Sequence, residues 1–175
     1  MKKTLIIGAA SLALAAMPVV GAFAATTFTD TVTITVSEAC SLSRSSGSGT
    51  YTATLAPNAV NANVGSSTLS AACNNPKGYT VKVATTALTN STVSSYTIPY
   101  STTTPAAGTS AWTVTKGASS ATTNIANNGT VMETSAADTS TTAATQQVTY
   151  KVSTSNIQAQ GSYSGTAVYT LTKKN

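Results

Sequence analysis

The clearest regular pattern of apolar and polar residues occupies residues 28–36. Threonine stands at every second position, and the residues between the threonines are Phe28, Asp30, Val32, Ile34 and Val36. Because successive side chains of a strand point to opposite faces, this period of two predicts a β-strand with one largely apolar face. The folded domain is therefore expected to begin with this strand.

Weaker alternation, broken by turn-forming residues, continues along the rest of the chain. It predicts further strands at residues 51–55, 69–73, 79–83, 96–100, 111–115, 148–152 and 163–171. Pro99 lacks a backbone N–H, which predicts a sheet edge there. Residues 116–145 hold few apolar residues, which predicts short strands and loops. No stretch has the 3.6-residue period of an amphipathic helix, so the pattern predicts an all-β domain, a β-sandwich.

Residues 1–24 have the features of a secretory signal peptide: a basic start at Lys2 and Lys3, an apolar stretch, and a small-x-small cleavage pattern that ends at Ala24. The apolar stretch is short for a membrane span. We therefore expect a single mature domain, residues 25–175, with no membrane span. The protein is expected to be bacterial and secreted or displayed at the cell surface, after passing through the periplasm if the envelope has an outer membrane.

Charge contributes little to this chain. Charged residues make up 7% of the sequence, with nine lysines and arginines, four acids and a formal net charge of +5. The basic residues are scattered, so no nucleic-acid partner is expected. Serine and threonine are abundant, which is common in exported adhesive and filament proteins.

The chain has two cysteines, Cys40 and Cys73. In an exported protein, two cysteines most simply form one disulfide. Cys40 shares the parity of Val36, and Cys73 shares that of Leu69, which predicts that both sulfurs face the core. Closing the loop between them should stabilise the fold by roughly 3–4 kcal/mol on the chain-entropy model.

Residues that usually carry catalysis are scarce. The chain has no histidine, which is the commonest general base and metal ligand. The four acids, Asp30, Glu38, Glu133 and Asp138, form no run of oxygen ligands and no apparent catalytic pair. We therefore expect a non-enzymatic protein with no catalytic residue, no metal site and no cofactor. A covalent Lys–Asn crosslink stays open.

Three parts of the chain resemble one known family. Residues 28–43 are similar to the first strand and first cysteine of spore-coat-U-like and chaperone–usher pilus subunits. Residues 69–83 resemble their second cysteine strand and the strand after it, and residues 161–171 resemble their closing strand. The resemblance implies an immunoglobulin-like antiparallel β-sandwich, often short of one strand. In that family, the N-terminal extension of a neighbouring subunit supplies the missing strand, through backbone hydrogen bonds along an exposed edge.

The segment before Cys40 then has two alternative roles. Residues 25–39 are too few for both a donor extension and a complete first strand. Either Phe28, Val32, Ile34 and Val36 pair within their own domain, which would then be complete, or they leave it as the donor strand.

The functional expectation is an exported structural or adhesive subunit, similar to a fimbrial subunit. Its partners would be copies of itself or other surface subunits, joined by β-strand addition, or a receptor on a host or neighbouring cell. The alternative is a secreted carbohydrate- or protein-binding module that presents Tyr96, Tyr100 and Trp112 as an aromatic contact surface. Trp112, at strand parity, is more often a core residue.

Overall fold

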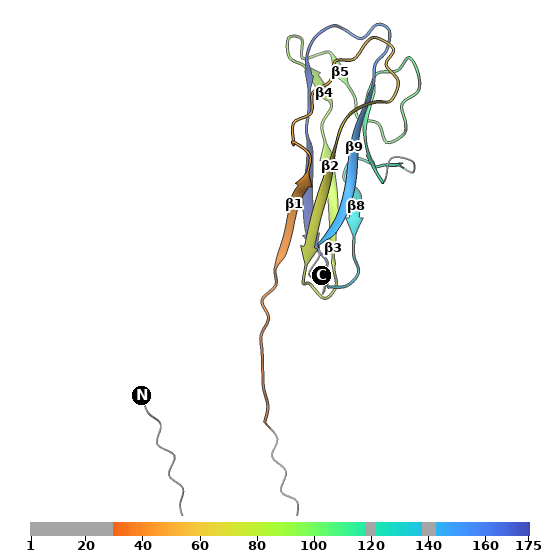
Figure 1. The fold of residues 1–175 in the computed structure, drawn as a ribbon. Coiled ribbons are helices and arrows are strands. Elements are labelled where there is room, and N and C mark those ends of the chain that lie inside the picture. Colours follow the sequence, from red (N-terminus) through yellow and green to blue (C-terminus); the bar gives the residue numbers. More distant parts are fainter. Residues whose placement is uncertain (1–29, 118–121, 138–142) are drawn as a thin grey trace, which may run out of the picture. The chain divides into compact units, whose positions relative to one another are not determined.

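The computed structural model describes residues 30–117, 122–137 and 143–175 (Figure 1). The predicted signal peptide and Phe28 lie outside the described residues. The chain divides into two units, Met1–Thr35 and Val36–Asn175, and every strand belongs to the second. Among the described residues the secondary structure is entirely β, without helix, and every pair of strands is antiparallel, as predicted.

The described residues form eleven strands, which vary from two to twelve residues in length. They are β1 (Cys40–Ser46), β2 (Ala62–Cys73), β3 (Tyr79–Thr85), β4 (Leu88–Asn90), β5 (Thr97–Ile98), β6 (Ala111–Lys116), β7 (Thr123–Asn124), β8 (Gly129–Glu133), β9 (Ala144–Ser153), β10 (Tyr163–Ser164) and β11 (Ala167–Lys173).

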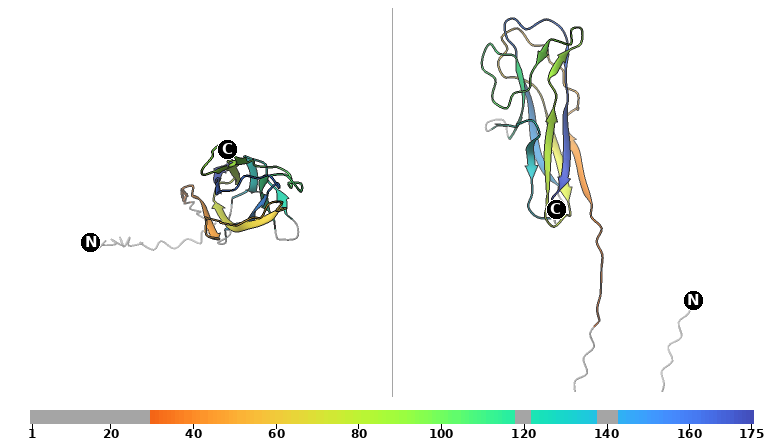
Figure 2. Two further views of the ribbon diagram at one scale, coloured as in Figure 1. Left: turned by 90° about the horizontal axis from the view of Figure 1, so that it is seen from above. Right: turned by 180° about the vertical axis from the view of Figure 1, so that it is seen from behind.

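These strands form one large sheet and two small ones. The large sheet has the order β1-β2-β9-β6-β7, and the small sheets have the orders β11-β3-β8 and β10-β4-β5. β1 therefore forms one edge of the large sheet, while β11 and β10 form edges of the small sheets. Figure 2 shows, from above and from behind, how the sheets enclose the interior of the second unit.

The core lies between the large sheet and the β11-β3-β8 sheet. Alternate residues of β3 point inward, so Tyr79, Val81 and Val83 are fully buried. They belong to one apolar cluster with residues of the large sheet such as Leu69 and Val148. The period of two therefore operates as predicted wherever a strand has a sheet opposite it.

Several predicted strands are confirmed. Residues 79–83, 111–115 and 148–152 lie within β3, β6 and β9, and residues 69–73 form the second half of β2. The edge prediction at Pro99 is also confirmed, because the short β5 next to it ends its sheet. The predicted strand at residues 163–171 is split into β10 and β11.

Two predicted strands are wrong. In the described part of residues 28–36 no strand forms, and these residues are exposed; residues 51–55 have no strand either. The physical reason is the same in both cases. A strand needs a backbone partner, and neither segment pairs with another described part of the chain. The first strand of the domain is instead β1, which the sequence pattern did not predict.

Candidate functional site

A long cleft of about 1050 Å³ opens in the second unit. We call it the edge cleft. Its first rim is residues 49–57, which follow β1, and its second rim is residues 158–167, which include β10 and the start of β11. Both rims continue from strands that end a sheet, so the cleft lies where two sheet edges stand apart.

The floor of the edge cleft is apolar. Side chains from β2, β4, β5, β6 and β9 line it: Val64, Leu88, Ile98, Trp112, Tyr150 and Val152. Leu55 and Tyr163 add apolar surface from the two rims. Ile98 and Trp112 are only 3% and 4% exposed, so the cleft reaches the core of the domain.

The first rim has free backbone groups. Residues 51–55 form no strand and make no backbone–backbone hydrogen bond with any described residue. The rim is held by a side chain instead, because the Tyr51 hydroxyl donates to the Ser66 carbonyl oxygen at 2.8 Å and also contacts the Ser67 hydroxyl. The Tyr51 ring lies against Gly65, where an added Cβ would be 2.2 Å from ring atom Cδ1.

The second rim pairs on one side only. β10 pairs with β4, and β11 pairs with β3. In an antiparallel pair, alternate residues direct their N–H and C=O groups away from the partner. No strand in the described part of the chain pairs with the outer edge of β11, so these groups are unpaired by any ladder. Of β11, however, only Ala167 lines the edge cleft, and backbone groups of Ser162 and Thr166 in the second rim already form hydrogen bonds. The edge cleft therefore offers the free backbone groups of residues 51–55, along its first rim, above an apolar floor.

Charge is almost absent from the edge cleft. Of the described residues that line it, Arg44 alone is charged. Its other described lining residues have small, apolar, hydroxyl-bearing or amide side chains. Its volume reaches the upper end of the range for small-molecule pockets. Its chemistry fits an extended chain with apolar side chains.

Residues 30–36 have the complementary composition. Val32, Ile34 and Val36 are 79%, 80% and 78% exposed, and they alternate with Thr31, Thr33 and Thr35. Three large apolar side chains with this much exposed surface, at alternate positions of one segment, are unusual on the surface of a folded protein.

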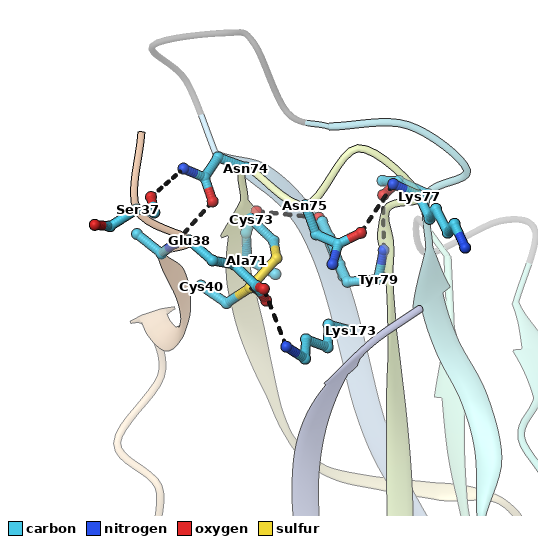
Figure 3. The surroundings of a disulfide bond; sticks show 12 residues. Ser37, Glu38, Cys40, Ala71, Cys73, Asn74, Asn75, Lys77, Tyr79 and Lys173 are labelled. Carbon is cyan, nitrogen blue, oxygen red and sulfur yellow. Dashed lines mark hydrogen bonds and ion pairs between the residues drawn. A yellow bond between two sulfur atoms is a disulfide. The ribbon is translucent and has the colours of Figure 1, made fainter. Parts of the chain in front are cut away.

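The disulfide joins β1 to β2 where residues 36–39 enter the domain (Figure 3). Cys40 and Cys73 are bonded as predicted, and they stand opposite each other in the ladder. The predicted orientation is right for Cys73, which is 1% exposed, and wrong for Cys40, which is exposed. Cys40 lies on an edge strand, where no neighbouring strand covers it.

Other contacts surround the disulfide. The Asn74 side chain accepts a hydrogen bond from the Ala39 N–H at 2.7 Å and donates one to the Ser37 carbonyl oxygen at 2.9 Å. Lys173, the last residue of β11, forms an ion pair with Glu38 at 3.0 Å. Figure 3 shows these side chains converging on residues 37–39 from β11 and from the end of β2.

The acidic residues considered above as candidate catalytic or metal-binding groups do not lie together. Glu38 and Cys40 lie with Cys73 at distances that suit metal ligands. However, the two sulfurs bond to each other and are not free thiolates. Glu133 pairs with Lys174, and the hydrogen bond and charge of Lys174 lower the pKa of Glu133. Asp138 lies outside the described residues.

The three aromatic residues named as a contact surface have different environments. Trp112 is a floor residue of the edge cleft, and its indole N–H donates to the Thr86 carbonyl oxygen at 3.1 Å. The Tyr100 ring packs edge-on against Trp112 at 5.0 Å, and Tyr100 is partly buried. Tyr96 alone of the three is well exposed. The buried position of Trp112 matches its expected role as a core residue.

No protein-family model, curated protein or solved structure matches this chain. Within the described ranges, no helix has the length and apolar character needed to cross a membrane.

Proposed function

We propose that this protein is an exported structural subunit that assembles by β-strand addition. Residues 30–36 of one copy fill the edge cleft of another, and the domain is an immunoglobulin-like sandwich that lacks one strand. The observation that carries the proposal is the match between an open apolar cleft, whose first rim has an unpaired backbone at residues 51–55, and an exposed segment of alternating apolar side chains.

The first rim is long enough for the segment. Residues 30–36 would extend over about 24 Å as a strand, at ~3.4 Å per residue. The first rim, residues 49–57, is longer than this segment in residue number. A strand placed beside the first rim would pair with the free backbone groups of residues 51–55.

The side-chain chemistry also agrees. A bound strand directs alternate side chains to one face, so Val32, Ile34 and Val36 would together meet the floor formed by residues such as Leu88 and Val152. Full burial of each side chain contributes roughly 1.5–3 kcal/mol. The intervening threonines would face solvent, which suits their polar hydroxyls.

Chain connectivity favours a second copy as the donor. Ala39 is fixed beside Asn74, one residue before β1. An extended chain spans at most about 3.6 Å per residue, so Val36 reaches about 11 Å from Ala39. The path along β1 from Ala39 to Arg44, which lines the edge cleft, is about 17 Å at strand spacing. Val36 therefore cannot reach the edge cleft of its own domain, so all three apolar side chains can be seated together only in the cleft of another copy.

A peptide titration tests the proposal. A synthetic peptide of residues 25–39 is added to the mature chain, and the fluorescence of Trp112 is followed, since it is the sole tryptophan and lies on the cleft floor. Binding covers the cleft floor, so it should change the Trp112 emission and raise the Tm. At a peptide concentration 100 times the Kd, the free energy of unfolding should rise by about 2.7 kcal/mol.

Two matched peptides serve as controls. A peptide with Ile34→Arg should fail to bind, because it places a charge on the apolar floor. A peptide with Thr33→Arg carries the same charge on the opposite face and should still bind. If none of the peptides changes the emission or the Tm of a monomeric sample, strand addition is the wrong function.

A further inference from the structure

Residues 37–39 are held tightly to the domain by Asn74. Its side chain accepts from the Ala39 N–H and donates to the Ser37 carbonyl oxygen, while its own N–H donates to the Ala39 carbonyl oxygen at 3.1 Å. One asparagine thus pairs with three backbone groups of this short segment, and Figure 3 shows the two bonds of its side chain. These contacts continue the β1–β2 ladder past the disulfide.

The same segment is also tied to the other side of the domain. Glu38 pairs with Lys173 of β11, which belongs to a different sheet from β1 and β2. Both side chains are partly exposed, at 53% for Lys173 and 39% for Glu38. An exposed ion pair adds little stability by itself, so its main effect here is to fix position. Residues 37–39 are therefore restrained by both sheets.

This arrangement has a consequence for an assembled chain. If Val36 and the residues before it belong to the cleft of the next subunit, residues 37–39 are all that lies between two folded bodies. Short free segments act as flexible linkers. Because all three residues are already bonded to their own domain, none of them is free to act as a hinge.

We propose that Asn74 and the Glu38–Lys173 pair form a root clamp, which makes the joint between successive subunits stiff. Asn74 is the main positioning residue of this clamp, and the Cys40–Cys73 disulfide anchors it. The inference rests on the proposed function, since the joint exists only in an assembly. It assigns these residues a role distinct from binding the donor strand, because none of them lines the edge cleft.

The test compares assemblies of the intact mature chain with those of two clamp variants, Asn74→Ala and Glu38→Lys. Persistence length is measured by electron microscopy of negatively stained assemblies. Asn127→Ala is the matched control, because the Asn127 side chain likewise accepts a backbone hydrogen bond, from the Thr85 N–H at 2.8 Å, at a site away from the joint. Thermal unfolding confirms that each variant is folded.

Release of the clamp should lower the persistence length by at least about twofold in Asn74→Ala, with Asn127→Ala unchanged. Glu38→Lys should show a smaller decrease, and adding Lys173→Glu should restore stiffness by re-forming the pair in reverse. In dissociated protein, the Ala39 amide should exchange its hydrogen roughly five- to tenfold faster in Asn74→Ala, since one hydrogen bond is lost.

The outcomes separate the clamp from the proposed function. Unchanged persistence lengths in both clamp variants overturn the clamp and leave strand addition intact. A wild-type chain that neither assembles nor binds the residue 25–39 peptide overturns strand addition, and the stiff joint with it. If Asn74→Ala does not fold, the persistence lengths of Glu38→Lys and of the double variant Glu38→Lys, Lys173→Glu decide the result, because both substitutions are at exposed positions.

Discussion

The rings of Tyr51 and Tyr150 lie 5.0 Å apart at a tilt of 35°. Tyr51 belongs to the first rim of the edge cleft, and Tyr150 belongs to β9 at the cleft floor. The contact therefore holds a segment without strand pairing against the large sheet. A rim fixed in this way keeps its backbone groups in place for a bound strand, which reduces the ordering cost of binding.

Substitution of Tyr51 should show how the rim is held. Tyr51→Phe loses the hydrogen bond to the Ser66 carbonyl oxygen and should lower the free energy of unfolding by about 1 kcal/mol. Tyr51→Ala also loses the ring packing on Tyr150 and should cost about 2 kcal/mol or more. Urea unfolding measures both. Equal stability of Tyr51→Ala and wild type would show that the rim is not anchored by this side chain.

The environment of Tyr169 should make the free energy of unfolding depend on pH in the alkaline range. Burial, and then the hydrogen bond to the Tyr150 hydroxyl at 3.0 Å, raise the pKa of Tyr169 above its usual 10.0. Above pH 10 the unfolded chain loses a proton that the folded chain keeps, so the free energy of unfolding should fall as pH rises, by up to about 1.4 kcal/mol per pH unit.

Tyr169→Phe removes the ionisable group and provides the test. The decrease in the free energy of unfolding between pH 9 and pH 11, measured in urea, should be smaller in Tyr169→Phe than in wild type. Exposed Tyr96 provides the matched control, and Tyr96→Phe should keep the wild-type decrease. A decrease of the same size in Tyr169→Phe and wild type would contradict the assignment.

Glu133 predicts an effect at acid pH. The hydrogen bond and charge of Lys174 lower the pKa of Glu133 below its usual 4.5. The folded chain then binds fewer protons than the unfolded chain near that pH, so the contribution to stability is present above pH 4.5 and is lost as pH falls through the lowered pKa. The effect should be small, because this pair is at the surface.

Lys174→Gln should remove this pH dependence, and Lys77→Gln should not. Lys77 is also exposed at the same end of the domain but forms no ion pair among the described residues. The Tm of each protein is followed from pH 6 to pH 3. A Lys174→Gln profile that parallels the wild-type profile would mean that the ion pair contributes nothing in solution.

The sequence pattern predicted strands most reliably where the same chain supplies the neighbouring strands and the facing sheet. β3, β6 and β9 were predicted because their alternating side chains meet a facing sheet and their backbones pair on both sides. The Cys40–Cys73 bond was predicted from cysteine number and compartment alone. β1 was missed because it is rich in serine and holds one large apolar residue, Leu42, which leaves no clear alternation.

The two predicted strands that are wrong are more informative. Residues 30–36 and 51–55 both alternate, yet neither is a strand in this chain. The alternation of apolar and polar residues indicates that a segment can lie with one face against an apolar surface. It does not indicate whether that surface belongs to the same chain. The cleft itself was beyond prediction, because its floor combines side chains from five strands spread over residues 62–153. Under the proposed function, both segments become strands when two copies meet.

The most direct test of strand addition is the mass of a chain of residues 25–175 in solution as a function of concentration. Light scattering coupled to size-exclusion chromatography is applied to wild type, Ile34→Arg and Thr33→Arg. Wild type and Thr33→Arg should form multimers that grow with concentration, while Ile34→Arg should stay a monomer, since a charge on the buried face costs several kcal/mol. Multimers of equal mass in Ile34→Arg and wild type, or a wild-type chain that is monomeric at every concentration, would contradict the account.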